Sequence, residues 1–348
     1  EIIDCEEDEK CSEICICEKE NIKYLYTIKN MYNGNILYPV GSSCITKFDR
    51  KDFRDPKIWE DNGTYHMLVG CRSEEIPGQV VLFSSKDLKE WKFETILAEN
   101  STGEIGVMWE CPDFFPLGDK HVLICSPQHM RAKGYEFHNG HNSLYFTGDY
   151  DSEKHTFEKD APVSLDYGLD FYAPQTTLLP DGRRVMIAWM RMPKPVESKD
   201  GTQWIGMMCL PRVVGIKNGQ VTFDVHPNVK ENFEEIDLTK VVLKLKEKQP
   251  LWITTTLSEG EELEIGGYEI CLEDGAVVGN RERVFADMEG YHVENQTPKV
   301  GKSAKLDIFV EENLIEIFVN DGQYVLSHVV YGLGDTLNGK IQKVRVLK

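Results

Sequence analysis

The sequence lacks any apolar run of the ~20 residues that a membrane-spanning helix needs, and its longest candidates, such as Val80–Phe83, are the length of strands. Positive charge is also scarce, because 39 Lys and Arg stand against 58 Asp and Glu and leave a net charge of -19. Such a chain repels phosphate backbones and anionic lipid head groups. We therefore expect neither nucleic acid nor a membrane as a partner, whereas the oligomeric state is left open.

The first residue is Glu1 rather than Met, and nothing near it has the pattern of an export signal. We expect that the sequence is N-terminally incomplete and that the protein is cytoplasmic. Four of the ten cysteines crowd the N-terminus, but their spacing suits zinc poorly and no histidine lies near them. They are Cys5, Cys11, Cys15 and Cys17. We expect inert thiols there, no metal site, and no organic cofactor.

Sustained helical periodicity is missing too. Apolar and polar residues alternate along most of the 348 residues, interrupted by Gly, Asn and Asp turns, which predicts an all-β protein. Three stretches share one plan: a strand around a proline, a turn, and then further apolar strands. The prolines are Pro56, Pro112 and Pro174, which gives steps of 56 and 62 residues.

A repeat of this size suits the blade of a β-propeller, because each blade buries its faces only against its neighbours. The short run Glu13–Cys17 resembles the outer part of one more blade. After Leu210-Pro211-Arg212 the repeat stops, and a polar stretch from Asn228 to Glu235 reads as a linker. Three alternating runs near the C-terminus then predict a β-meander within a sandwich. We expect an incomplete propeller over residues 1–226 and a β-sandwich over 227–348.

Two carboxylates occupy equivalent places in successive repeats, Asp55 beside Arg54 and Glu110 beside Cys111. The first strand of a propeller blade lines the central channel, so these side chains would converge on one axial pocket. An Asp beside an Arg would stay ionised, whereas a Glu among aromatic residues such as Trp109 would favour its protonated form, the division of labour that glycosidases need. The alternative is a structural Arg54–Asp55 ion pair with Glu110 merely solvated at a strand edge.

Several motifs, in this order, resemble those of glycoside hydrolase family 32, which contains the β-fructofuranosidases. They are Phe53-Arg54-Asp55-Pro56, Trp109-Glu110-Cys111-Pro112, Asp170-Phe171-Tyr172-Ala173-Pro174-Gln175-Thr176, Gly182-Arg183-Arg184-Val185, Leu210-Pro211-Arg212 and Ile315-Glu316-Ile317-Phe318-Val319-Asn320-Asp321-Gly322. The resemblance implies a five-bladed β-propeller joined to a β-sandwich. It also implies a retaining enzyme that hydrolyses terminal β-fructosyl linkages, as in sucrose, sucrose 6-phosphate or short fructans.

By the same resemblance, Glu110 would be the general acid/base and Asp55 would stabilise the transition state. Arg54 would hold Asp55 and sugar hydroxyls, while Cys111 and Tyr172 would position Glu110. The nucleophile of that family is the Asp of an N-terminal Asn-Asp-Pro-Asn motif, and this motif is missing from the sequence. A retaining mechanism needs a nucleophile, so we expect this chain alone to be nearly inactive. The alternatives are a non-catalytic fructoside-binding protein and an arabinan-type five-bladed glycosidase.

Other side chains have two readings each. Trp189, with Trp204, Met207 and Met208, would either form a platform for a sugar or pack in the core, and the core is favoured. The stretch from His129 to His141 would either recognise an acceptor sugar or a phosphate, or be a solvated loop. Its polar members are His129, Arg131, Lys133, His138 and His141.

Overall fold

The computed structural model describes residues 2–12, 14, 22, 24–29, 36–41, 52–73, 75–198, 200–217, 219–285 and 290–348. Strands dominate these residues, and the helical elements are short. A three-stranded antiparallel sheet comes first, formed by β1 (Ile2–Glu7), β2 (Tyr24–Lys29) and β3 (Ile36–Gly41). Most of the predicted blade remnant and two of the N-terminal cysteines, Cys15 and Cys17, lie outside the described residues. Cys11 is a free thiol.

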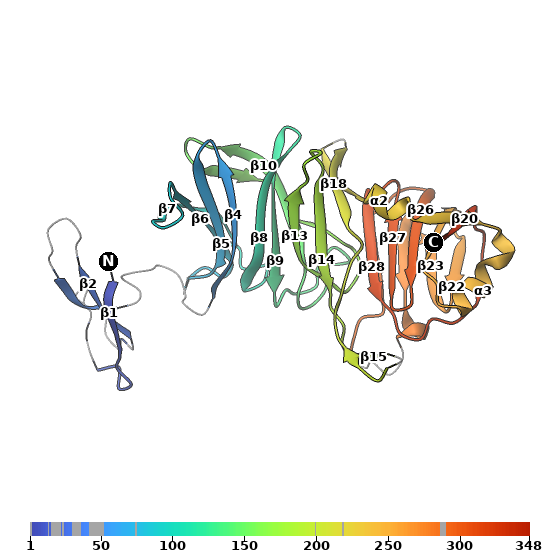
Figure 1. Ribbon diagram of the computed structural model, residues 1–348, viewed down its shortest axis with the longest axis horizontal. Coiled ribbons are helices and arrows are strands. Elements are labelled where there is room, and N and C mark those ends of the chain that lie inside the picture. Colours follow the sequence, from blue (N-terminus) through green and yellow to red (C-terminus); the bar gives the residue numbers. More distant parts are fainter. Residues whose placement is uncertain are drawn as a thin grey trace.

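The three predicted repeats are three antiparallel sheets that follow one another along the molecule (Figure 1). In each sheet the first strand is followed by its neighbours in chain order, as in a propeller blade. The first blade contains β4 (Phe53–Asp61), β5 (Thr64–Cys71), β6 (Gln79–Ser85) and β7 (Lys92–Glu99). The second contains β8 (Met108–Leu117), β9 (Lys120–Gln128), β10 (Leu144–Asp151) and β11 (Thr156–Lys159), with β12 (Val163–Ser164) beside β10.

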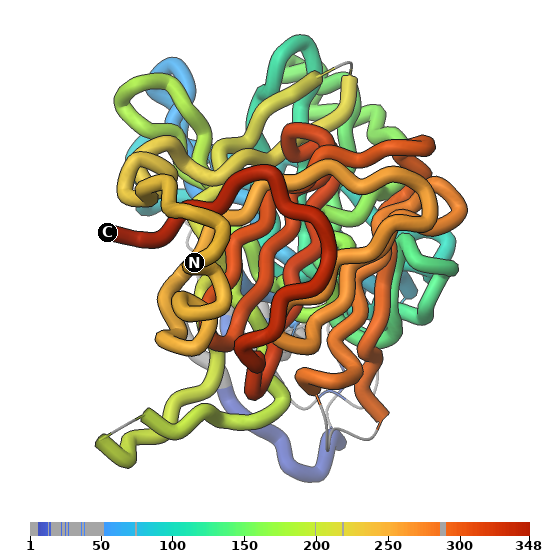
Figure 2. Tube along the Cα trace, turned by 90° about the vertical axis from the view of Figure 1, so that its right-hand side faces the viewer, coloured from blue at the N-terminus to red at the C-terminus, as the bar shows by residue number. Residues whose placement is uncertain are grey.

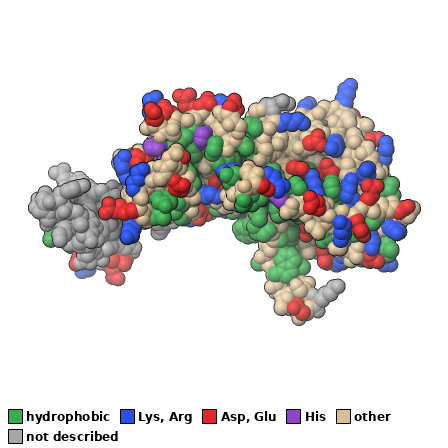
Figure 3. Space-filling model, turned by 45° about the horizontal axis from the view of Figure 1, so that its top comes forward, with side chains coloured by type: hydrophobic (Ala, Val, Ile, Leu, Met, Phe, Trp, Pro, Cys, Tyr) green, Lys and Arg blue, Asp and Glu red, His purple; other side chains and the backbone are tan. Residues whose placement is uncertain are grey.

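The third blade departs from this plan because an arm is inserted between its second and third strands. The blade contains β13 (Phe171–Leu178), β14 (Arg184–Met190), β18 (Arg212–Lys217) and β19 (Gln220–Val225), with β17 (Met207–Met208) beside β14. The arm contains β15 (Val196–Glu197) and β16 (Gln203–Trp204), which form a two-stranded antiparallel sheet. It projects from the body of the molecule, and hydrophobic side chains gather near its base (Figure 3).

The same irregularity interrupts the first strand of every blade. The strand register shifts between Arg54 and Lys57 in β4, between Glu110 and Asp113 in β8, and between Tyr172 and Gln175 in β13. The residue before each proline has a left-handed backbone, with φ of 60° at Asp55, 50° at Cys111 and 53° at Ala173. A β-bulge suits this position, since proline cannot donate to the ladder and a bulge leaves one residue unpaired. The repeated bulges turn side chains at one level of the three strands toward one another.

Two sheets form the C-terminal sandwich, which Figure 2 shows in front of the blades. One sheet has the order β20 (Phe233–Ile236), β30 (Lys343–Leu347), β21 (Leu251–Ser258), β26 (Ser303–Glu311), β27 (Leu314–Val319) and β28 (Tyr324–Val329). The other has the order β25 (Glu294–Gln296), β24 (Ala276–Asn280), β23 (Tyr268–Glu273), β22 (Glu262–Ile265) and β29 (Leu337–Asn338). The predicted meander is confirmed as β26, β27 and β28.

The helical elements are few and lie mainly where the chain passes from the blades into the sandwich. They are α2 (Pro227–Lys230), η1 (Leu238–Lys240), α3 (Val241–Lys246) and η2 (Glu282–Val284). The interpretation of Asn228–Glu235 as a linker is wrong, because it contains part of α2 and the start of β20, whose register pairs Phe233 with Leu347. The exact domain boundary stays a prediction.

Strand β27 shows how the sandwich meets the third blade. All six of its residues are buried, although successive side chains of a strand point to opposite faces. Ile315, Ile317 and Val319 belong to the core of the sandwich. The alternate residues Leu314 and Phe318 pack in a second core that includes Phe115 of β8, Met186 of β14 and Phe223 of β19. This second core therefore runs from the blades into the sandwich.

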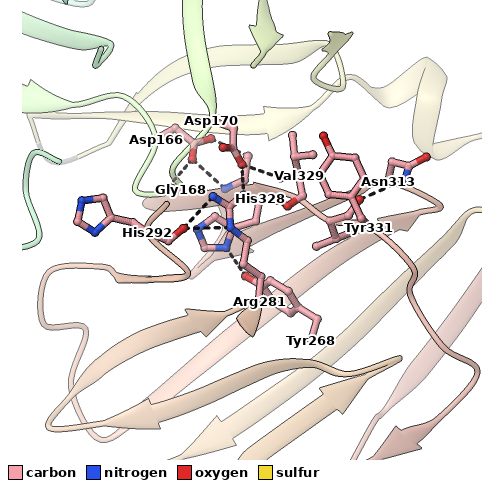
Figure 4. A network of polar contacts seen from close by, with 12 residues as sticks. Asp166, Gly168, Asp170, Tyr268, Arg281, His292, Asn313, His328, Val329 and Tyr331 are labelled. Atoms are coloured by element: carbon pink, nitrogen blue, oxygen red, sulfur yellow. Dashed lines mark hydrogen bonds and ion pairs between the residues drawn. The ribbon is translucent and has the colours of Figure 1, made fainter. Parts of the chain in front are cut away.

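Buried ion pairs accompany this apolar contact. Arg212 in β18 is fully buried and binds Asp166 at 2.8 Å and Glu316 of β27 at 2.6 Å. Arg281 binds Asp170 and the carbonyl of Val329, and the backbone N–H of Val329 donates to the same carboxylate at 2.8 Å (Figure 4). Two predicted motifs, Leu210-Pro211-Arg212 and Ile315–Gly322, thus meet at the junction of the two layers, since Leu210 also donates its N–H to Glu316.

Candidate active site

Glu110 lies where the first strands of all three blades come together. The Nε of Arg54 donates to Glu110 Oε1 at 2.8 Å, and the hydroxyl of Tyr172 donates to Glu110 Oε2 at 2.5 Å. These pairs are 56 and 62 residues apart, the same steps that separate the three prolines. Contacts between equivalent positions of successive repeats are what strands around one axis would make. The prediction treated Asp55 as the equivalent of Glu110, and it is wrong by one residue, because Asp55 and Cys111 each directly precede the proline of their blade. The position equivalent to Glu110 is Arg54, and its contact, with that of Tyr172, brings the three inner strands to one site.

Asp55 joins the same group through the backbone of the second blade. Cys111 donates its backbone N–H to Asp55 Oδ2 at 3.0 Å, and its Sγ lies 3.7 Å from the same oxygen. Burial, followed by the charges of Asp55 and Glu110, raises the pKa of the Cys111 thiol to about 12. A thiol with that pKa stays protonated at neutral pH and is a poor nucleophile. Cys111 therefore acts as a support for Asp55 rather than as a reactive group.

The predicted partner of Arg54 is wrong. Its side-chain hydrogen bonds in the described structure go to Asp52, Glu110 and Gln128, not to the adjacent Asp55. Burial alone would lower the pKa of Arg54, but the hydrogen bonds to Asp52 and Glu110 outweigh it and raise the pKa. Adjacent residues of a strand point to opposite sides, so the neighbour in sequence is a poor guide to the partner in space.

The aromatic surroundings predicted for Glu110 are also wrong. Trp109 is fully buried on the other face of β8, where its indole N–H donates to the carbonyl of Ile105 at 2.8 Å. Its ring packs against Phe146 with centroids 5.4 Å apart. Glu110 itself is 16% exposed and faces a guanidinium and a phenol. The carboxylate therefore sits in a polar cradle with both of its oxygens hydrogen-bonded.

Tyr172 is the third contributor and comes from the inner strand of the third blade. Burial first, and then the hydrogen bond to Glu110, raise its pKa far above the ordinary value. The phenol consequently stays protonated, and besides Glu110 its hydroxyl contacts the carbonyl of Ser126 at 3.2 Å. Its ring meets that of Trp189 edge to face, with centroids 6.4 Å apart.

Trp189 lies on an open face of the third blade, and the favoured prediction of a core position is wrong for it. Its side chain is 42% exposed, and Trp204 and Met208 are exposed as well. Successive residues of β14 alternate, so Ala188 and Met190 fill the buried face and Trp189 takes the other. The alternative, a platform for a sugar, stays a prediction for Trp189.

A second layer of polar contacts, which was not predicted from the sequence, lies one step further along the same strands. The Nζ of Lys57 lies 3.3 Å from Asp113 Oδ2 and 2.6 Å from the carbonyl of Thr176, whose own N–H donates to Asp113 at 2.8 Å. Lys57 and Asp113 directly follow Pro56 and Pro112, and that equivalence was the signal that could have revealed them. These residues line a cavity of about 1030 Å³ that does not include Glu110 or Asp55.

Charged and imidazole side chains surround the site on the side of Tyr172. His141 lies with its ring centroid 5.3 Å from that of Tyr172 and 5.3 Å from that of His129. Arg131 and Lys133 are exposed on the same loop. In the part of the chain that the structure describes, no group of three or more His, Cys, Asp or Glu side chains is placed to hold a metal ion. No helix among those residues is long and apolar enough to cross a membrane.

The described blades and the C-terminal sandwich define the class of proteins that join a β-propeller to a β-sandwich, and comparisons with known proteins agree with it. Residues 12–227 match the model of the glycosyl hydrolases family 32 N-terminal domain, and residues 267–342 match that of the family 32 C-terminal domain. The chain belongs to glycosyl hydrolase family 32.

Curated relatives support the same family. The chain is 33% identical over 294 residues to the sucrose-6-phosphate hydrolase of Bacillus subtilis, an alignment that covers 79% of this chain and 60% of the relative. It is 32% identical over 302 residues to the raffinose invertase of Escherichia coli, with 82% and 62% covered. The chain thus spans about three fifths of the length of the curated relatives it matches.

Solved structures support the fold. A β-fructofuranosidase of Bombyx mori superposes with a TM-score of 0.68 at 24% identity, and the match covers 93% of this chain and 71% of that one. The sucrose-6-phosphate hydrolase of Lactobacillus gasseri gives a TM-score of 0.70 at 22% identity with the same coverage. The predicted architecture, a five-bladed propeller type followed by a β-sandwich, is confirmed as the fold of this family.

Proposed function

We propose that this chain forms the acid/base side of a retaining β-fructofuranosidase site, which hydrolyses terminal β-fructosyl linkages of sucrose, sucrose 6-phosphate or short fructans. The observation that carries the proposal is the position of Glu110, held by Arg54 of one blade and Tyr172 of another with Asp55 close by. The curated relatives named a sucrose-6-phosphate hydrolase and a raffinose invertase support a sucrose-type substrate.

Each residue has a distinct task in this proposal. Glu110 protonates the oxygen of the departing sugar and afterwards takes a proton from water. Its two oxygens are occupied by Arg54 and Tyr172 in the free protein, so the substrate oxygen displaces or shares one of these donors. Asp55, fixed by the N–H of Cys111, binds fructosyl hydroxyls and stabilises positive charge that develops on the ring. Arg54, Cys111 and Tyr172 are positioning residues, and Trp189 offers its exposed ring face to a sugar.

The nucleophile of a retaining reaction does not come from a recognisable motif in this sequence. The family resemblance implies an Asp within Asn-Asp-Pro-Asn, and these four residues do not occur together here. Without a carboxylate to form the covalent fructosyl intermediate, the first half of the reaction cannot proceed. We therefore expect very slow release of fructose by the 348-residue chain alone.

The experiment compares this chain with a fusion that places an Asn-Asp-Pro-Asn-bearing segment of a family member ahead of it. We expect the fusion to release fructose from sucrose, and Glu110→Gln to lower kcat by on the order of a thousandfold. Glu104→Gln is the matched control, because that side chain is exposed. A Glu110→Gln fusion with unchanged turnover would contradict the assigned role.

The missing motif favours one second candidate, a fructoside-binding protein without catalysis. Calorimetric titration of the chain with sucrose tests it directly. Binding of sucrose by a fusion that releases no fructose would favour the binding protein. Release of arabinose from arabinan instead of fructose from sucrose would favour the arabinan-type glycosidase.

A further inference from the structure

We propose that Gln175 is a positioning residue for the reaction, because it holds the backbone of Cys111 and through it the carboxylate of Asp55. The inference rests on the proposed function and deepens it, since it names what fixes the group that stabilises the transition state. The three residues come from the inner strands of the three blades, β13, β8 and β4.

The bulge in β8 takes the backbone of Cys111 out of the register between β8 and β9. The paired positions pass from Glu110 to Asp113 and skip Cys111 and Pro112. Cys111 also has a left-handed backbone, with φ of 50°. This conformation is uncommon for a residue other than glycine, and it persists only where the surrounding structure enforces it. Contacts from outside the ladder of β8 and β9 are therefore needed to hold Cys111.

Side chains of the two neighbouring blades supply these contacts. Asp55 of β4 accepts the N–H of Cys111 at 3.0 Å, and Nε2 of Gln175 in β13 donates to the carbonyl of Cys111 at 3.0 Å. The two polar backbone groups of one strained residue are thus held from opposite blades. Fixing the carbonyl restricts rotation of the backbone at Cys111, and thereby the direction of the N–H that Asp55 accepts.

Lys57 decides which end of the Gln175 amide faces Cys111. Its Nζ lies 3.2 Å from Gln175 Oε1. An ammonium group only donates and a backbone carbonyl only accepts, so one orientation of the amide satisfies both neighbours. The amide oxygen faces Lys57 and the amide nitrogen faces Cys111. Without Lys57, the amide could turn over and present an acceptor to the carbonyl of Cys111.

Lys57 is itself held by the second polar layer. Its Nζ contacts the carbonyl of Thr176 at 2.6 Å and Asp113 Oδ2 at 3.3 Å. With Gln175, these acceptors match the three donors of the ammonium group. Asp113 is 1% exposed and accepts the N–H and the hydroxyl of Thr176 at 2.8 and 2.7 Å. The cation that orients the amide therefore has a fixed position.

The contacts form a closed path across the three blades. The path runs from Lys57 in β4 to Gln175 in β13. It continues to Cys111 in β8 and returns to β4 at Asp55. Each member of such a hydrogen-bonded ring limits the movement of the next. The position from which Asp55 meets positive charge on the fructosyl ring is therefore set by all three blades together.

The variant Gln175→Glu separates positioning from stability. A glutamate keeps an acceptor for Lys57 but has no donor for the carbonyl of Cys111. The side chain of Gln175 is exposed, so we expect the variant to fold with a urea midpoint close to that of the wild-type chain. The N–H of Cys111 should then exchange with deuterium about tenfold faster, because its hydrogen bond to a carboxylate loses support.

The exchange is measured by nuclear magnetic resonance on the 348-residue chain, isotope-labelled at its cysteines, with Cys111→Ser to identify the resonance. Gln220→Glu is the matched control, because Nε2 of Gln220 also donates to a backbone carbonyl, that of Gln323, at 3.1 Å. It should leave exchange at Cys111 unchanged. Gln175→Met is a second variant of similar length that removes both hydrogen bonds of the amide, and it should give the same increase as Gln175→Glu.

Kinetics of the fusion described above connect the contact to the reaction. Gln175→Glu should lower kcat by about tenfold and change KM by less than about threefold, because Asp55 matters most when positive charge develops on the ring. The control Gln220→Glu should change neither value.

Unchanged exchange at Cys111 in both Gln175 variants would overturn the inference, and so would an equal increase in Gln220→Glu. A wild-type kcat for Gln175→Glu, in a fusion that Glu110→Gln inactivates, would overturn the inference and leave the proposed function standing. A fusion that releases no fructose would overturn the proposed function and, with it, the role of Gln175 in the reaction.

Discussion

Replacing Arg212 by Met should destabilise the junction between blades and sandwich more than any surface charge change. The side chain of Arg212 is fully buried, and its partners Asp166 and Glu316 are 0% and 1% exposed. The variant would leave two carboxylates in the interior without their cation. Breaking a buried pair in this way costs about 3–5 kcal/mol, because the remaining charge is uncompensated, and the net stability of a domain is only about 5–15 kcal/mol.

The structure also indicates which carboxylate suffers more. Asp166 keeps donors from the N–H groups of Gly168 and Ser327, each at 2.8 Å, and from the Ser327 hydroxyl at 2.7 Å. Glu316 keeps the N–H of Leu210 at 2.7 Å. A second substitution, Glu316→Gln, should therefore recover part of the loss caused by Arg212→Met, because it removes the less well satisfied charge.

Urea unfolding followed by far-UV circular dichroism and tryptophan fluorescence measures these effects. Arg183→Met is the control, since its ion pair with Asp181 is exposed and should contribute less than about 1 kcal/mol. If Arg212→Met costs no more than the Arg183 control, the buried network does not hold the two layers together. A double variant that is less stable than Arg212→Met would contradict the ranking of the two carboxylates.

Two further predictions concern the same junction. Gly322→Ala should be about 1–3 kcal/mol more destabilising than Gly182→Ala in urea unfolding. Both positions have positive φ, but a Cβ at Gly322 would clash with the carbonyl oxygen of Phe223, whereas the space beside Gly182 is open. Equal losses would refute the close contact. Burial, and then the charges of Arg281 and His138, hold the pKa of His328 well below 6.5. The folded protein therefore keeps this residue neutral, while the unfolded chain gains a proton as pH falls below 6.5, so the free energy of unfolding falls by about 1.4 kcal/mol per pH unit. His328→Gln should flatten this pH dependence by the same amount. An unchanged slope would show that His328 takes up its proton in the folded state.

The repeated strand pattern in the sequence predicts most of the observed fold. Alternation and turn residues located the strands of all three blades and the meander, because each strand has one face toward a neighbouring blade or sheet. The arm of β15 and β16 was not anticipated, because two-residue strands leave no periodic signal. Strand β20 was missed for another reason: it is an edge strand with no buried residue, so its composition resembles that of a linker.

For the candidate site, the sequence predicted which residues come together but not which of them contact each other. The repeat pattern brought Asp55 and Glu110 to one group, whereas Arg54 and Tyr172 were expected there only from the family resemblance. Their partners were misjudged because adjacent residues of a strand point to opposite sides, so a neighbour in sequence is not a neighbour in space. Arg54 therefore turned out to face the neighbouring blade rather than Asp55, and Trp109 turned away from Glu110.

The sandwich supports the site through a short path of contacts and is not merely appended to the blades. Asp170, which precedes β13, is buried and receives hydrogen bonds from Arg281 and from the N–H of Val329 in the sandwich. Two residues further along the chain, Tyr172 reaches Glu110. A strand whose beginning is anchored by buried charges has little freedom to shift, so the hydroxyl that orients Glu110 is fixed from the opposite layer of the molecule.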